Sequence, residues 1–230
     1  MHVLCLSNGN YDKLGWIRSK EMLSACQIIG LETCNVQVLD DDRIPDGPHV
    51  IWEDGVVSGV IEEYLVQSVE SKASFSGSGC VRIITFDEYG VSGHPNHCDT
   101  SRGVCRFLYD VQLGHVDLKL KKLKFYLYRL RSVPVWRKYC VVVDLLYEGL
   151  RWFISVCFLF IWGGSRKDQD NYFFAFHPKL TWMAMAAHHS QFVWYRRLSV
   201  LFSRYTYINS LDEMKQTHIN RSCISAKKET

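Results

Sequence analysis

Two histidines on a short segment rich in glycine and proline are the residues of this sequence best suited to chemistry. The segment Gly93-His94-Pro95-Asn96-His97 places them three positions apart, and Gly90 lies just before it. Imidazole nitrogen is a good zinc ligand, and glycine lets a backbone turn tightly around a site. If only one histidine binds metal, the other can polarise a carbonyl group or protonate a leaving group. An exposed loop with two incidental histidines would have the same spacing, and this alternative stays open.

A carboxylate precedes the histidines. Asp87 directly follows the β-branched run 81–86 and could orient one imidazole through a hydrogen bond without touching the metal. A hydrolytic zinc site needs three protein ligands and a base, however, and one loop cannot supply them. Any further ligands must therefore come from other segments.

The first half of the chain alternates between strand and helix patterns. Short apolar runs at 3–7, 36–39 and 81–86 predict strands, and helical periodicity at 17–29 and 53–69 separates them. Strand–helix–strand units in this order predict an α/β fold with a parallel sheet and helices on its faces. Ligands of such sheets bind beyond the carboxyl ends of the strands, which is where the loop 87–97 would lie.

The second half is more apolar. Its pattern predicts a helix over 98–110, strands at 122–131 and 171–176, and helical stretches over 133–162 and 180–207. The most apolar run, 152–162, would span only about 17 Å as a helix, against a hydrocarbon core of about 30 Å. We interpret it as a buried or interfacial helix in preference to a membrane span.

Charge and cysteine content bear on the possible partners of the chain and on the cellular compartment that it faces. The net charge is +3, and basic residues gather in the second half, either to face an acidic surface or as ordinary solvated side chains. The nine cysteines are dispersed and form no C-x-x-C pair, which indicates reduced thiols in a cytosol-facing chain. No nucleic-acid partner is indicated.

Four blocks of the sequence resemble one known family. The string TFDEYGVSGHPNH at 85–97 resembles the second metal motif of the LmbE-like (PIG-L) deacetylases, which are zinc hydrolases. LCLSNGN at 4–10, the R-x-x-E helix at 18–30 and the block 188–211 resemble other parts of that family, in the same order. The resemblance implies a Rossmann-like, three-layer fold with a mostly parallel sheet over residues 1–211, followed by a polar, disordered tail at 212–230.

The resemblance also implies a reaction and roles for particular residues. The reaction is removal of acetate from N-acetylglucosaminyl-phosphatidylinositol in the synthesis of glycosylphosphatidylinositol anchors. His97 would bind zinc, His94 would face the substrate carbonyl as an acid or electrostatic catalyst, and Asp87 would support His94. Arg18 and His188 would bind substrate. Each residue also has a structural alternative. Arg18 could simply pair with Glu21 on its own helix, and His188 could be a hydrogen-bonded histidine where two helices cross.

One part of the family pattern does not occur in this sequence. The family begins with a strand that ends in His-Pro-Asp-Asp-Glu, which supplies two zinc ligands and the general base, and no such string is present here. We therefore expect a chain that lacks the first strand, holds zinc weakly through His97 and has little or no activity. A non-catalytic isoform that binds lipid or a partner is the alternative, followed by a deacetylase of a soluble N-acetylated sugar.

The last four residues bear on location. Lys227-Lys228-Glu229-Thr230 resembles a dilysine retrieval signal of endoplasmic reticulum membrane proteins, although a solvated tail would look the same. Together with the family resemblance, this predicts the cytosolic face of the endoplasmic reticulum membrane, where the lipid substrate and the membrane surface would be the partners.

Overall fold

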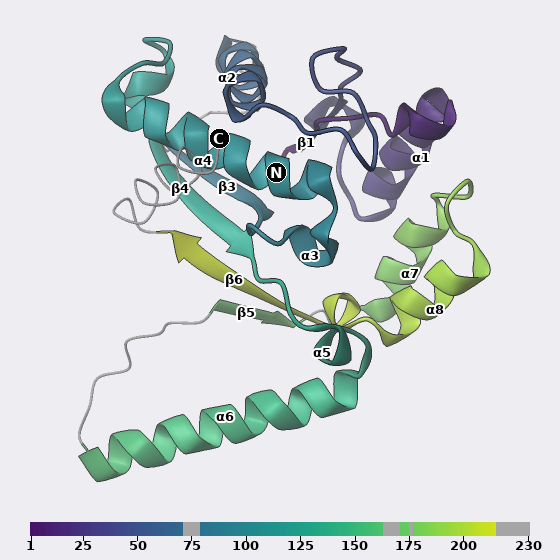
Figure 1. The fold of residues 1–230 in the computed structure, drawn as a ribbon, viewed down its shortest axis with the longest axis vertical. Helices are drawn as coiled ribbons and strands as arrows, with labels where there is room; N and C mark the ends of the chain where they lie inside the picture. The colour runs from purple at the N-terminus through teal and green to yellow at the C-terminus, as the bar shows by residue number, and fades with distance from the viewer. Residues whose placement is uncertain (71–78, 163–170, 175–176, 215–230) are drawn as a thin grey trace. The chain divides into compact units, whose positions relative to one another are not determined.

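The structure is a computed structural model of the chain and describes residues 1–70, 79–162, 171–174 and 177–214 (Figure 1). These residues form a mixed α/β fold with parallel strands and helices, which confirms the predicted fold class. They group into two compact units, each built from segments far apart in the sequence. We call Leu4–Gly15, Val38–Ser132 and Asp212–Thr230 the core unit, and Met1–Val3, Trp16–Gln37 and Val133–Leu211 the helical unit.

The N-terminal elements follow the predicted order. They are β1 (Val3–Cys5), a 3-10 turn (Asn10–Asp12), α1 (Gly15–Ile28), a 3-10 turn (Thr33–Asn35), β2 (Val36–Val38) and α2 (Asp54–Glu70). Gly30 follows α1 with φ 85°, the left-handed conformation that commonly ends a helix. β1 and β2 form a two-stranded sheet of their own.

The centre of the core unit is a parallel pair of strands covered by a helix. β3 (Cys80–Phe86) pairs with β4 (Lys124–Leu130) in register from Cys80 opposite Lys124 to Phe86 opposite Leu130. Between them the chain forms α3 (Gly90–Gly93), α4 (Pro95–Leu113) and a 3-10 turn (Leu120–Lys122). Figure 1 shows α4 running over the two strands, with α3 just beyond the end of β3.

The hydrophobic core lies in this unit. α2 packs against α4, and the two helices lie close together at Gly103, where an added Cβ would lie 2.2 Å from Cγ1 of Val57. The buried apolar cluster comprises Leu6, Ile44, Trp52, Val57, Val60, Ile61, Leu65, Val104, Cys105, Phe107, Leu108, Val116, Leu120 and Leu127. All of these side chains belong to the core unit.

The helical unit is organised differently. It contains α1, α5 (Val135–Tyr139), α6 (Val141–Trp162), α7 (Pro178–Ala186), α8 (Trp194–Phe202) and a 3-10 turn (Arg204–Thr206). β5 (Asn171–Phe174) pairs antiparallel with β6 (Ile208–Met214), with Asn171 opposite Leu211. Among the helices described, none combines the length and apolar character that crossing a membrane requires.

A buried ionic network connects three segments of the helical unit. Asp144, on α6, accepts from Nε of Arg137 on α5 at 2.5 Å and from Nε of Arg204 at 2.5 Å. The side chains of Asp144 and Arg204 are fully buried, and Glu148 pairs with Arg137 one turn further along α6. Charges with this little access to water are tolerated because each has an oppositely charged partner at hydrogen-bond distance.

Two predicted helical stretches are interrupted. The stretch 133–162 divides at Cys140, whose backbone leaves the helical region (φ −121°, ψ 73°). The stretch 180–207 divides between α7 and α8, because the Ser190 N–H donates to the Glu21 carboxylate at 2.7 Å instead of to a carbonyl of its own helix. Local periodicity could not reveal a hydrogen-bond partner 169 positions away.

Two further differences concern segment boundaries. The histidine segment was predicted as a loop, but α4 begins at Pro95, so His97 lies on a helix; proline is favoured at a first helical position because its φ is preset. β6 continues through Met214, into the segment predicted as a disordered tail, where Asp212 pairs with Arg131 (3.1 Å). The rest of the predicted tail and the dilysine sequence lie outside the described residues.

Candidate functional site

The histidine pair follows a tight turn at the carboxyl end of β3. Gly90 has φ 58°, and an added Cβ there would lie 2.7 Å from Cβ of His97, so only glycine leaves room for the histidine. Val91 also has a positive φ of 65°, which is costly for a β-branched residue. The Val91 N–H donates to Oγ of Ser132 at 2.8 Å, which helps to hold this conformation in place.

Asp87 organises this turn. Its carboxylate accepts from the N–H groups of Tyr89 and Gly90 at 3.1 Å, and from the backbone N–H and hydroxyl of Ser132 at 2.5 and 2.6 Å. The register explains the proximity, since Phe86 lies opposite Leu130 and both strands end at the same edge. In the structure Asp87 thus supports the loop that carries His94, and a direct hydrogen bond between the two side chains stays a prediction.

His97 lies in the first turn of α4, and its protonation pattern follows from its neighbours. Nδ1 is 3.1 Å from the carbonyl oxygen of Gly90. A carbonyl oxygen can only accept, so Nδ1 carries the proton and the lone pair of the neutral ring is on Nε2. Metal-binding histidines commonly have this arrangement. The ring also stacks on Phe86, with centroids 4.2 Å apart and planes 12° from parallel, which fixes its orientation.

His94 is the residue immediately before α4, and its ring centroid lies 5.2 Å from that of His97. Its Nδ1 is buried and has no hydrogen-bond partner within the described part of the chain. A buried polar atom without a partner costs free energy, and in a native structure it commonly marks a functional group that pairs with a ligand. The structure therefore brings His94, His97 and Asp87 together around one turn.

Asn96, between the two histidines, is a site residue that the sequence analysis missed. It is buried, and its Nδ2 donates to Oδ1 of Asp46 at 2.9 Å, while Oδ2 of Asp46 accepts from the Tyr11 N–H at 3.2 Å. Asn96 and Asp46 thereby connect the histidine turn to the loop after β1. The Asn-Gly-Asn sequence of that loop was a signal for a turn, but the partner at Asp46 had no local signal.

The two predicted substrate-binding residues lie in the helical unit. Arg18 is half-buried on α1, and one turn later Glu21, also buried, accepts from the N–H and hydroxyl of Ser190 at 2.7 and 2.6 Å. Both oxygens of Glu21 thus hold the turn that contains His188. Burial lowers the pKa of the His188 imidazole below its usual value, an effect that Glu21 partly opposes and Arg196 reinforces. Their binding roles stay predictions.

The donors present do not complete a zinc site. The described residues contain no group of three or more His, Cys, Asp or Glu side chains placed to hold one metal ion. His97 has a tautomer suited to ligation, but Asp87 is committed to the turn and a hydrolytic zinc needs three protein ligands. The described residues therefore do not fit the expected metal by themselves.

Comparison with known proteins agrees with the sequence blocks. Residues 1–108 match the family model PIG-L, described as GlcNAc-PI de-N-acetylase. The chain is 35% identical to N-acetylglucosaminyl-phosphatidylinositol de-N-acetylase of Bos taurus, over 92% of this chain and 71% of that protein. It is 28% identical to the probable enzymes of that name from Dictyostelium discoideum (93% and 81% of the two chains) and Schizosaccharomyces pombe (92% and 73%). The chain belongs to the PIG-L family of GlcNAc-PI de-N-acetylases.

Proposed function

We propose that this chain is a de-N-acetylase of N-acetylglucosaminyl-phosphatidylinositol, a hydrolase of glycosylphosphatidylinositol-anchor biosynthesis. The relatives bear this name, and the carrying observation is the turn that brings His94, His97 and Asp87 together at the carboxyl end of β3. A parallel sheet commonly presents its ligand site at this end.

In this proposal each site residue has a separate task. His94 uses its buried Nδ1, which has no partner within the part of the chain that the structure describes, to polarise the acetyl carbonyl or to stabilise charge that develops on its oxygen. His97 would hold the metal through Nε2, and the Gly90 carbonyl keeps its ring in the tautomer that this requires. Asp87 keeps the turn in shape. Arg18 and His188 bind the substrate, with the arginine suited to a phosphate group.

The proposed zinc site needs ligands in addition to His97, and the described residues do not supply them. Because a lone imidazole holds zinc weakly, we expect this chain by itself to bind zinc at well below one equivalent and to deacetylate slowly or not at all. A working site would require donors from residues outside the described set or from another chain.

Zinc content and acetate release test the proposal together. The purified chain is analysed for bound zinc and is given N-acetylglucosaminyl-phosphatidylinositol in detergent, with the Bos taurus enzyme as reference. Near-stoichiometric zinc binding, together with the deacetylation rate of the reference enzyme, would refute the inference that the zinc site of this chain is incomplete. Acetate release from soluble N-acetylglucosamine alone would instead favour a soluble-sugar deacetylase.

Three histidine variants separate the roles. His97→Gln should weaken the residual zinc affinity, whereas His94→Gln should retain that affinity and lower any residual rate by about 10²–10⁴-fold. His115→Gln is the matched control, because His115 is an exposed histidine of the same unit. If the zinc affinity of His97→Gln and the rate of His94→Gln are both unchanged, the roles assigned to these two histidines are wrong.

A non-catalytic role in binding lipid or a partner is the second candidate, and the apolar surface of the helical unit favours it. We place either function at the cytosolic face of the endoplasmic reticulum membrane. The eight cysteines that the structure describes form no disulfide bond there, and reduced cysteines support a cytosol-facing chain. Imaging of a tagged chain beside a reticulum marker, before and after replacement of both lysines of the terminal dilysine sequence, tests this location.

A further inference from the structure

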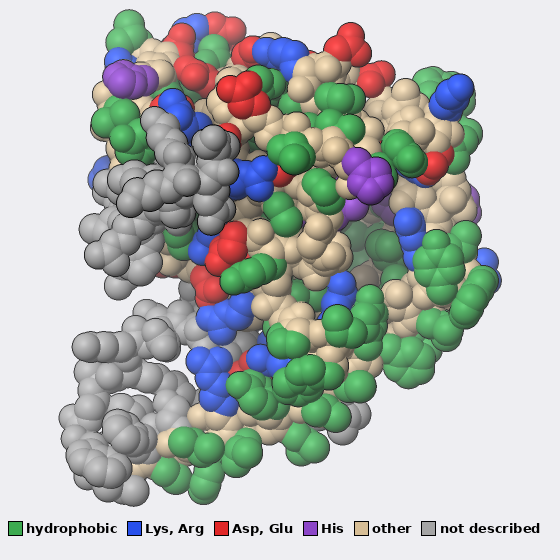
Figure 2. All heavy atoms as spheres, in the orientation of Figure 1, with side chains coloured by type: hydrophobic (Ala, Val, Ile, Leu, Met, Phe, Trp, Pro, Cys, Tyr) green, Lys and Arg blue, Asp and Glu red, His purple; other side chains and the backbone are tan. Residues whose placement is uncertain are grey.

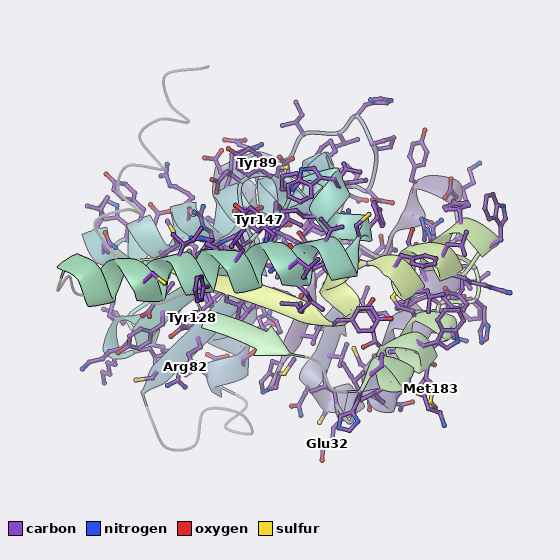
Figure 3. All side chains as sticks on the ribbon, turned by 90° about the horizontal axis from the view of Figure 1, so that it is seen from below. Glu32, Arg82, Tyr89, Tyr128, Tyr147 and Met183 are labelled. Carbon is purple, nitrogen blue, oxygen red and sulfur yellow. The ribbon has the colours of Figure 1, made fainter. Side chains whose placement is uncertain are left out.

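The surface of α7 and α8 is unusually apolar. These two packed helices, with the turn between them, leave many large hydrophobic side chains exposed to solvent, and Trp194 is 72% exposed. The exposed set comprises Leu180, Trp182, Met183, Val193, Trp194, Tyr195, Leu198, Leu201 and Phe202. We call it the α7–α8 patch. Met183 projects outward from α7 in Figure 3, and Figure 2 shows hydrophobic side chains gathered over both helices.

The part of the patch on α8 forms one helical stripe. At about 100° per residue, Trp194, Leu198 and Leu201 lie on a single face. Tyr195 and Phe202 extend that face on one side, and Val200, the buried residue of the helix, lies away from it. In an ordinary amphipathic surface helix the apolar stripe packs against the core of the protein. In α8 the apolar stripe faces solvent instead.

Apart from Trp182, the patch side chains are not the ones that hold these two helices together. The turn between them is held by Glu21, which binds Ser190, and by Phe192, whose ring meets Trp182 edge-on with centroids 5.1 Å apart. Val200 supplies the buried contact of α8. The exposed side chains therefore remain available to bind something outside the unit.

Charge indicates what that partner is. From residue 171 to residue 211 the sequence contains no aspartate or glutamate, while Lys179, Arg196 and Arg197 lie on α7 and α8. The helical unit as a whole has eleven basic and six acidic residues, a net charge of +5, against sixteen and eighteen, a net −2, in the core unit. A basic surface with exposed apolar groups complements an anionic surface with an apolar interior.

We propose that the α7–α8 patch binds the surface of an anionic lipid bilayer. Amphipathic helices with Trp and Leu on one side and basic residues beside them bury their apolar face at the boundary between headgroups and acyl chains. Tryptophan and tyrosine favour that boundary, and arginine side chains reach lipid phosphates from its edge. The proposed lipid binding does not depend on the deacetylase activity. One consequence rests on the proposed function: His188, as a substrate-binding residue in the turn between the helices, would lie beside the lipid headgroups.

Sedimentation with vesicles tests the proposal. The full chain is mixed with phosphatidylcholine vesicles, with or without about 20 mol% phosphatidylinositol as the anionic lipid. We expect binding that is stronger on the anionic vesicles and falls as salt is raised. Trp194→Glu with Leu198→Glu should reduce partitioning by about tenfold or more, and Arg197→Gln should reduce only the preference for anionic vesicles.

Two controls make the outcome decisive. Leu118→Glu replaces an exposed leucine of the core unit (74% exposed) and should leave binding unchanged, whereas Trp194→Phe should preserve it. Circular dichroism checks that each variant is folded. The proposal is overturned if folded Trp194→Glu with Leu198→Glu binds vesicles as the wild type does. It is also overturned if the wild type does not bind the vesicles. Conversion of a dimer to a monomer by the same variant would in that case show that the patch binds a second copy.

Discussion

The two units of this protein place their apolar and charged side chains in opposite ways. The core unit buries a continuous apolar cluster between its strands and helices and carries its ion pairs mainly at the surface, as Arg43 does with Asp41. The helical unit buries an ionic network around Asp144 and exposes large hydrophobic residues on α6, α7 and α8. A unit stabilised from within by paired charges can leave its apolar surface exposed, and this surface is the basis of the proposed lipid binding.

Asp144→Ala should have the largest effect. The substitution leaves Arg137 and Arg204 buried without their shared carboxylate, and we expect a loss of about 3–5 kcal/mol in the free energy of unfolding of the helical unit. Six of the seven tryptophans belong to that unit, so fluorescence during guanidinium denaturation reports it. Asp41→Ala, in an exposed pair, should change little. Equal curves for both variants would mean that the network does not stabilise the unit.

Gly103→Ala tests the core unit in the same way. The new methyl group would overlap Val57, so α4 must move from α2, at a cost of about 1–3 kcal/mol. Val57→Ala in the same chain should restore only part of the loss, because it removes Cγ1 but leaves Cβ of residue 57 at 2.4 Å from the new methyl group. Gly59→Ala, where nothing lies within 4 Å of the added atom, is the matched control and should be neutral or stabilising. Thermal unfolding followed by circular dichroism measures all three.

Val91→Gly should stabilise the core unit by about 1 kcal/mol, since it removes the cost of a positive φ at a β-branched residue. The gain is limited because glycine loses more backbone entropy on folding. Urea denaturation gives the sign. A destabilised variant would show that packing of the valine side chain outweighs backbone strain at the histidine turn.

His188→Gln should have the smallest effect, visible only in pH dependence. Burial lowers the pKa of His188 in the folded state, so the unfolded chain binds the proton more tightly. The stability of the helical unit should thus be highest above the unfolded pKa of about 6.5 and fall as pH is lowered from there toward the folded pKa. Denaturation midpoints between pH 8 and about 5 should depend less on pH in the variant than in the wild type. An identical profile in both proteins would exclude this contribution.

Much of the fold could be predicted from local pattern. The β-branched run before Asp87 became β3, the apolar period after Glu53 became α2, and Gly30 ended α1 as expected. The four family blocks led to the family that the comparisons then showed. These predictions succeeded because periodicity and turn residues act over a few positions of the chain.

The site depended on contacts that local pattern does not contain. The sequence predicted Asp87 as a support for His94, but it contained no sign of Ser132, which the register of β3 with β4 brings to this carboxylate across 45 positions. The helix predicted over 180–207 is divided because Glu21 binds Ser190 across 169 positions.

By itself, the sequence of this protein determined its residue types, its helix and strand periods and the spacing of His94 and His97. Only the tertiary structure decided that Nδ1 of His97 bonds Gly90 while Nδ1 of His94 has no partner among the described residues, and that the apolar stripe of α8 faces solvent. The physical reason is that a hydrophobic period specifies one face of a helix but not what covers it, and an imidazole's role depends on neighbours that folding brings to it.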